Sequence, residues 1–142
     1  MAEALMRAEL EARGLDGVKV SSAGIAADGT SATTASALAV LAKLGVKARS
    51  RRSRLLAEGD LAAADLVLTM TDLQKQRIAL EHPWALAKTF VMPEFSGSRR
   101  AEISDPIGGL EREYLDCALA LRAEAKRMVP GIRRILRRRS ER

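Results

Sequence analysis

A polar segment rich in Gly and Ser, residues 96–109, contains the run Ser104-Asp105-Pro106-Ile107-Gly108-Gly109. Proline restricts the residue before it to extended conformations, which helps to aim the carboxyl of Asp105. A carboxyl on such a loop can give a proton to a departing oxygen, so Asp105 is a candidate general acid. Asp-Pro is also an ordinary turn signal, and the residues alone leave that structural role open.

Few other side chains in the chain could take part in catalysis. The single cysteine, Cys117, cannot form an internal disulfide or supply a zinc site by itself, and no metal site or cofactor is expected. Cys117 lies within a predicted helix without glycines around it, which favours packing in the core. The only histidine, His82, precedes Pro83 in a turn, and we expect it to have a surface role.

Length and composition predict one domain over residues 1–142, with a basic C-terminal extension at 130–142. The formal net charge is +6, and arginines gather at residues 49–54 and near the C-terminus. The aromatic residues number only four, too few for a base-stacking platform, so nucleic acid is not expected as a partner. No apolar run is long enough to cross a bilayer and no secretory signal opens the chain, so we expect a cytoplasmic protein without membrane contact.

Apolar periodicity and capping residues predict helices at residues 1–13, 34–44, 57–64 and 72–81, and a long helix from residue 110. Runs typical of strands occur at residues 18–22, 66–70 and 88–92. Because helices alternate with strands, the predicted class is α/β, a three-layer domain with helices flanking a mainly parallel sheet.

Some local features predict more detail. The apolar residues 66–68 are consecutive, so their strand is expected to be buried on both faces. Thr71 and Gln74 have the spacing of a capping box for the next helix. Pro93 should stop the strand at 88–92, and Pro130 should kink or interrupt the last helix.

Four segments, in this order, resemble the low-molecular-weight protein tyrosine phosphatases: Met-Ala-Glu-Ala-Leu, Ser-Ser-Ala-Gly, Ala-Asp-Leu-Val-Leu-Thr-Met-Thr and Asp-Pro-Ile-Gly-Gly. The resemblance covers the chain from residue 1 to about residue 129. In that family a buried strand and a phosphate loop of pattern Cys-x5-Arg-Ser precede Met-Ala-Glu-Ala. The resemblance implies a phosphotyrosine protein phosphatase I-like fold without its first central strand and loop, and we expect an in-frame Cys-x5-Arg-Ser in the upstream codons.

The resemblance also implies roles for single residues. Asp105 matches the family's general acid, and Ser22 matches a serine that supports the phosphate loop from behind. A role for Ser22 in satisfying a turn is equally open. Arg51 stands where a supporting histidine often occurs, so that support is altered. Arg122 follows Cys117 after four residues instead of five, so no nucleophile is expected within the chain.

The implied activity is hydrolysis of phosphoprotein monoesters, or of phosphoarginine, through a cysteinyl-phosphate. It belongs to a form of the protein that contains the Cys-x5-Arg-Ser loop. The 142-residue chain itself is expected to be inactive. Ile107-Gly108-Gly109 looks closer to bacterial members, some of which remove phosphate from protein arginine. The alternatives are a non-catalytic binding or regulatory protein and, last, an arsenate reductase, which needs additional cysteines. Without the family's first central strand, sheet edges would be left unpaired. We therefore expect the chain alone to be poorly stable or to dimerise.

Overall fold

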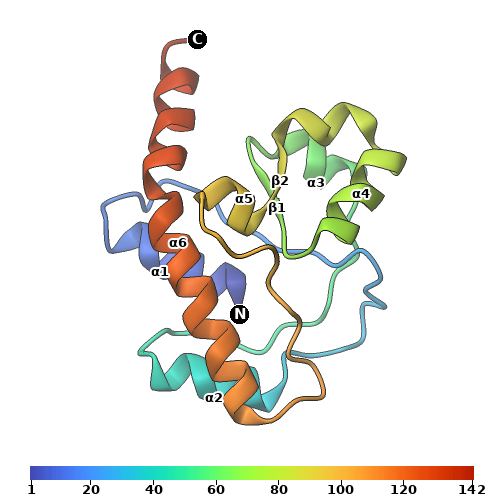
Figure 1. The fold of residues 1–142 in the computed structure, drawn as a ribbon, viewed down its shortest axis with the longest axis vertical. Coiled ribbons are helices and arrows are strands. Elements are labelled where there is room, and N and C mark those ends of the chain that lie inside the picture. The colour runs from blue at the N-terminus through green and yellow to red at the C-terminus, as the bar shows by residue number, and fades with distance from the viewer. The chain divides into compact units, whose positions relative to one another are not determined.

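The computed structural model describes residues 1–142 and contains mostly helices, with two short strands (Figure 1). In chain order the elements are α1 (Ala2–Glu11), α2 (Ala35–Lys43), α3 (Glu58–Ala63), β1 (Val67–Thr69), α4 (Asp72–Glu81), the 3₁₀ helix η1 (Pro83–Lys88), β2 (Thr89–Val91), α5 (Met92–Ser96) and α6 (Glu111–Ser140). Each predicted helix is present, with ends close to those predicted.

The two strands form a parallel pair in which Leu68 lies opposite Phe90. This confirms the α/β class and the strands predicted at 66–70 and 88–92, although each is shorter than predicted. Residues 66–68 are half-buried, so the prediction of burial on both faces is wrong. A sheet of two strands is all edge, and its residues therefore keep contact with solvent.

Side-chain caps explain where two of the helices begin. The Oγ1 atom of Thr71 accepts a hydrogen bond from the Gln74 amide, and Gln74 Oε1 accepts one from the Thr71 amide, each at 3.3 Å. This confirms the predicted capping box of α4. Thr34 caps α2 by accepting a bond from the Ala37 amide at 3.2 Å.

The chain forms two compact units. The first unit contains Met1–Leu56 and Asp105–Ala125, and the second contains Ala57–Ser104 and Lys126–Arg142. Each unit has its own buried apolar residues: Leu5, Leu10, Val40, Leu41 and Leu121 in the first, and Leu61, Ile78, Ala85, Met92 and Met128 in the second. The single-domain organisation stays a prediction.

Residues 18–22 are not a strand, contrary to the prediction. No strand is hydrogen-bonded to this segment, and a ladder cannot form without a partner. Arginine side chains satisfy its carbonyl groups instead, since Arg7 Nη2 donates to the Val20 oxygen at 2.9 Å and Arg54 Nη2 donates to the Ser22 oxygen at 3.1 Å. Side chains rather than a backbone ladder therefore fix the segment.

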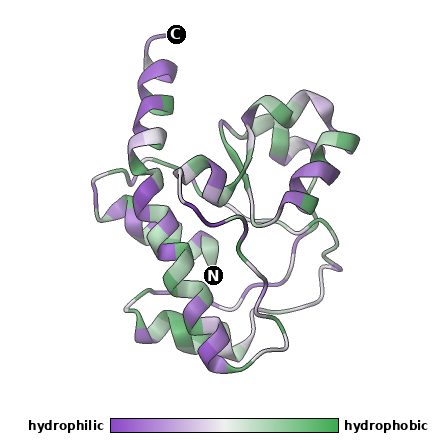
Figure 2. Ribbon diagram, in the orientation of Figure 1, coloured by the Kyte–Doolittle hydropathy of each residue, from purple (hydrophilic) through white to green (hydrophobic).

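Pro130 was predicted to kink or interrupt the last helix; α6 continues through it, so the interruption does not occur. Because Pro130 has no backbone N–H, the carbonyl of Lys126, four residues earlier, lacks its helical hydrogen bond. Lys126 is exposed, and water can replace that bond. Beyond the proline, Ile132 is buried, which favours continuing the helix. The basic extension 130–142 is thus mostly helical, with alternating hydrophilic and hydrophobic positions (Figure 2). Neither α6 nor any other helix has the length and apolar character to span a bilayer.

Helix α5 was not predicted. Pro93, which was expected only to stop the preceding strand, lies in the first turn of this short helix. Proline is favoured there because the first turn does not use its backbone N–H groups and the fixed φ suits a helix. Gly97 follows the helix with a φ of +74°, a conformation that glycine adopts without strain.

Candidate functional site

Asp105 is exposed and lies in the loop that leads into α6. Its Oδ1 atom accepts a hydrogen bond from the backbone N–H of Ile107 at 3.0 Å, which orients the carboxyl within its own turn. The second oxygen, Oδ2, makes no hydrogen bond. One oxygen of the carboxyl is therefore held by the loop and the other is available to carry a proton.

The two glycines after Asp105 are required by the path of the loop. Gly108 has a φ of +76°, which other residues rarely adopt. A Cβ at Gly109 would lie 1.8 Å from Glu113 Oε2 and 2.8 Å from the Pro106 oxygen. The same Glu113 oxygen accepts a bond from the Leu110 amide at 2.9 Å, which joins the loop to the first turn of α6.

Apolar side chains lie on both sides of this glycine pair. Ile107 is 72% exposed and Leu110 is 75% exposed. Large apolar side chains with most of their surface in water offer contact area for the apolar part of a ligand. The acid loop, defined here as residues 104–110, thus combines a carboxyl with apolar surface.

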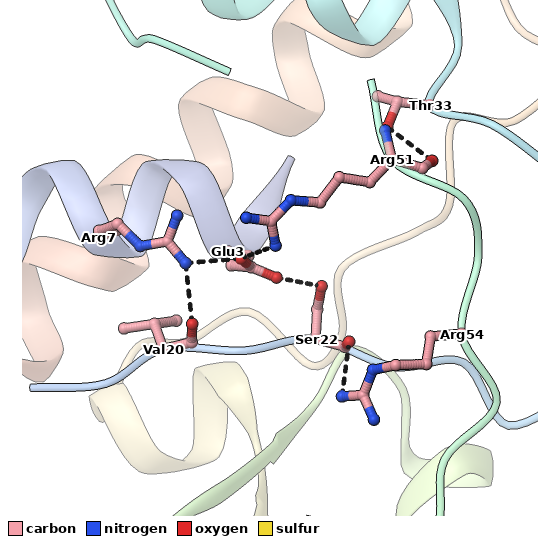
Figure 3. Close-up of polar contacts among 7 residues, drawn as sticks. All are labelled: Glu3, Arg7, Val20, Ser22, Thr33, Arg51 and Arg54. Atoms are coloured by element: carbon pink, nitrogen blue, oxygen red, sulfur yellow. Dashed lines mark hydrogen bonds and ion pairs between the residues drawn. The ribbon is translucent and has the colours of Figure 1, made fainter. Parts of the chain in front are cut away.

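A second group of polar side chains meets at Glu3, near the start of α1 (Figure 3). Glu3 Oε1 accepts hydrogen bonds from Arg7 Nη2 at 2.7 Å and Arg51 Nη1 at 2.8 Å. Glu3 Oε2 accepts a bond from the Ser22 hydroxyl at 2.6 Å. The Glu3 side chain is only 13% exposed, and both of its oxygens are satisfied by charge-assisted bonds. We call Glu3, Arg7, Ser22 and Arg51 the Glu3 cluster.

Backbone bonds hold the arginine-rich segment 49–54 against residues that follow Ser22 in the chain. The Thr33 amide donates to the Arg51 oxygen at 3.0 Å, and the Arg51 amide donates to Thr33 Oγ1 at 3.1 Å (Figure 3). The Gly24 amide donates to the carbonyl oxygen of Arg54 at 2.8 Å. These contacts bring the Arg51 guanidinium to the start of α1.

The surroundings of Glu3 change its pKa in two opposing ways. Desolvation by burial alone would raise the pKa. The hydrogen bonds from Ser22 and Arg7 and the charges of Arg51 and Arg7 outweigh it, so that the pKa of Glu3 lies below its usual value of 4.5. Glu3 is therefore ionised at neutral pH, with its ion pairs intact.

The structure brings together Ser22, for which the resemblance implies a supporting role, and Arg51, which stands where a supporting histidine often occurs. Both are bonded to Glu3. Asp105 belongs to the same compact unit but shares no hydrogen bond with them.

The remaining candidates lie elsewhere. Cys117 is on α6 and half-buried, so it lies less deep than the core position that was predicted. Its helical backbone has no glycine nearby and cannot curl around an anion. His82 is in the second unit, where its ring meets the edge of Trp84 at 6.0 Å between centroids. Nothing in the chain forms a group of three side chains suited to a metal ion.

Sequence reasoning missed Glu3 as the centre of a cluster. The spacing of Glu3 and Arg7 is that of an ion pair one helical turn apart, and this signal was available. Nothing local links Glu3 to Arg51, which lies 48 positions later in the chain. Long-range pairs of this kind require the structure.

Solved phosphatase structures have the same fold. The chain aligns with a crystal structure of a YwlE mutant from Bacillus subtilis with a TM-score of 0.86 and 30% identity, covering 93% of this chain and 88% of that one. A YwlE arginine phosphatase from Geobacillus stearothermophilus gives a TM-score of 0.81 and 31% identity, covering 93% and 85% of the two chains.

The family model described as low molecular weight phosphotyrosine protein phosphatase matches residues 1–139, and the chain belongs to this family. It is 38% identical over 100 residues to a protein-arginine-phosphatase of Geobacillus stearothermophilus, covering 70% of this chain and 67% of the relative. It is 31% identical over 133 residues to a probable low molecular weight protein-tyrosine-phosphatase, EpsP, of Ralstonia solanacearum, covering 94% and 86%.

We expect Glu3→Gln to lower the free energy of unfolding at neutral pH by about 1–2 kcal/mol, because it weakens three charge-assisted bonds. A carboxyl whose pKa is lowered by folding stabilises the protein above its unfolded pKa and loses this contribution as pH falls through its folded pKa. The difference from wild type in urea unfolding should therefore be full at neutral pH and shrink below the usual pKa of 4.5.

The matched control is Glu11→Gln, because Glu11 is exposed on the same helix and its side chain makes no hydrogen bond. It should change the free energy of unfolding by less than about 0.5 kcal/mol. A Glu3→Gln difference that persists undiminished at strongly acidic pH would contradict the expectation.

Proposed function

We propose that the protein removes phosphate from side chains of phosphorylated proteins, with Asp105 as the general acid. The observation that carries the proposal is the acid loop, in which the exposed Asp105 carboxyl keeps one free oxygen and the Leu110 amide donates to Glu113 in the first turn of α6. Membership of a phosphatase family over residues 1–139 supports the same reaction class. In this reaction the phosphorus–oxygen or phosphorus–nitrogen bond breaks, and Asp105 gives its proton to the departing atom.

We further propose that Ser22 and Arg51 act as positioning residues through Glu3. The amino end of a helix favours an anion, because its first N–H groups are free and the helix dipole is positive there. Glu3 ties Ser22 and Arg51 to this end of α1. The cluster would thus keep the residues around a bound phosphate in a fixed arrangement.

Phosphoarginine and phosphotyrosine are the two candidate substrate groups. The relatives are named protein-arginine-phosphatase and probable low molecular weight protein-tyrosine-phosphatase. Ile107-Gly108-Gly109, in place of paired aromatic residues, supports a bacterial type of specificity. A location in the cytoplasm stays a prediction.

The proposed route through a cysteinyl-phosphate needs a thiolate at the phosphate. Cys117 does not fit this role, because it lies within helical backbone that provides no anion-binding loop. We therefore propose that the activity belongs to a form of the protein that includes a Cys-x5-Arg loop. A non-catalytic binding role for residues 1–142 is the second candidate, and the same observation on Cys117 supports it.

The 142-residue chain should not turn over an aryl phosphate such as p-nitrophenyl phosphate, because no thiolate is placed to attack phosphorus. Release of nitrophenolate by the purified chain measures this directly. Cys117→Ser is the control, since a contaminating activity would survive the substitution. Turnover by the chain that disappears in Cys117→Ser would overturn the proposal.

In a form of the protein that turns over phenyl phosphate, Asp105→Asn should lower kcat by about 100-fold or more, because the phenolate must leave without a proton. With p-nitrophenyl phosphate the loss should be smaller, since nitrophenolate is a better leaving group. Asp116→Asn changes another exposed carboxyl, on α6, and should leave both rates unchanged. Equal losses with the two substrates would argue against proton donation.

We also propose that the open edge of β1 makes residues 1–142 self-associate or leaves them poorly stable. The strand pairs on one side only, and an edge with unpaired N–H and C=O groups favours pairing with another strand. Sedimentation velocity over a dilution series should show a dimer, or thermal scans of the monomer should lack a cooperative transition. A monomer that unfolds in one cooperative step would count against this proposal.

A further inference from the structure

A cleft of about 300 Å³ lies in the second unit, where the sheet meets the second half of α6. Much of its lining is apolar, and it includes Phe90 on β2 and Phe95 on α5. The two rings lie 5.4 Å apart between centroids and are tilted by 56°. This volume is at the lower end of the range for small-molecule sites.

The cleft is also lined by Lys88, Arg134 and Arg138. Lys88 Nζ donates to the Ala64 carbonyl at 2.7 Å, so it is partly satisfied within the protein. Arg134 and Arg138 lie one turn apart on α6, and neither makes a hydrogen bond or an ion pair. Their guanidinium groups are therefore available to a ligand.

The only carboxylate in the lining does not neutralise these charges. It belongs to Asp65, whose Oδ2 accepts a bond at 2.6 Å from Arg139, a residue outside the lining. The cleft thus combines aromatic surface with uncompensated positive charge. Such a combination suits an anion that carries an aromatic group.

A glycine shapes the same cleft. The Phe95 ring packs so closely on α6 that a Cβ at Gly131 would lie 2.9 Å from its Cζ atom. Phe95 can keep its present position only because residue 131 has no side chain. Gly131→Ala would therefore push the ring away from the helix and change the lining.

We propose that the cleft binds a small aromatic phosphate-type dianion. Its ring contacts Phe90 and Phe95, and its anionic group lies between the guanidinium groups of Arg134 and Arg138. Planar guanidinium groups match the geometry of phosphate oxygens, and aromatic rings stack or meet edge to face. None of the lining residues belongs to the acid loop or to the Glu3 cluster, so this site is separate in its residues from the proposed catalytic one.

Benzylphosphonate is a suitable probe, because its carbon–phosphorus bond cannot be hydrolysed by a phosphatase. Trp84, the single tryptophan of the chain, reports on the cleft, since Lys88 Nζ lies 5.6 Å from the centroid of its ring. Titration of the 142-residue protein, followed by tryptophan fluorescence and calorimetry, should show saturable binding. The double variant Arg134→Gln, Arg138→Gln should weaken it by about tenfold or more, because two charge-assisted contacts are lost.

The matched control is the double variant Arg127→Gln, Arg137→Gln. It removes the same charge from the same helix, at exposed positions outside the cleft. It should alter the affinity by less than about twofold, as expected for screened surface charges. Methylphosphonate and benzyl alcohol, which lack the ring and the charge respectively, should bind at least about tenfold more weakly than benzylphosphonate.

Equal weakening by the two double variants would overturn the proposal, because it would show only a general effect of charge. Methylphosphonate binding as tightly as benzylphosphonate would overturn the role of the aromatic lining. Absence of saturable benzylphosphonate binding to folded protein would overturn the site altogether. None of these readouts depends on turnover, so their failure leaves the proposed role of Asp105 untouched.

Discussion

The nearly buried carboxylate of Glu3 is the interaction on which the irregular part of the first unit depends. Residues 12–34 and 44–57 contain no helix or strand, so no regular backbone ladder holds them. Glu3 instead binds Ser22 from one of these segments and Arg51 from the other. A buried carboxylate must be matched by donors, and here the donors come from distant parts of the chain. This ion-pair cluster therefore adds a side-chain connection to the isolated backbone bridges that join the two segments.

The two parts of the candidate site are held by separate interactions. The Glu3 cluster depends on a carboxylate and its partners, whereas the acid loop depends on Gly108, Gly109 and the Glu113 carboxylate at the start of α6. A change in one part is therefore not transmitted through a shared hydrogen bond to the other. This separation is consistent with the proposal that Asp105 is a general acid, since its loop can move without breaking a bond of the Glu3 cluster.

Local signals predicted the helices well, because caps such as Thr71 and Thr34 act within a few residues. The acid role of Asp105 was predicted from Asp-Pro and from family resemblance, and it stays a prediction. The segment 18–22 was predicted wrongly because a strand needs a partner, which its own residues do not specify. The bond between Glu3 and Arg51 could not be predicted either, since no local pattern encodes a contact across 48 positions.

Hydrogen exchange at two backbone amides tests most directly whether Glu3 holds the irregular segments together. The amides of Gly24 and Thr33 donate to the carbonyl oxygens of Arg54 and Arg51. If Glu3 fixes the arginine-rich segment, Glu3→Gln should speed exchange at both amides by about tenfold or more, while amides within α4 are unchanged. Unchanged exchange at Gly24 and Thr33 in a folded Glu3→Gln protein would contradict the central role of Glu3.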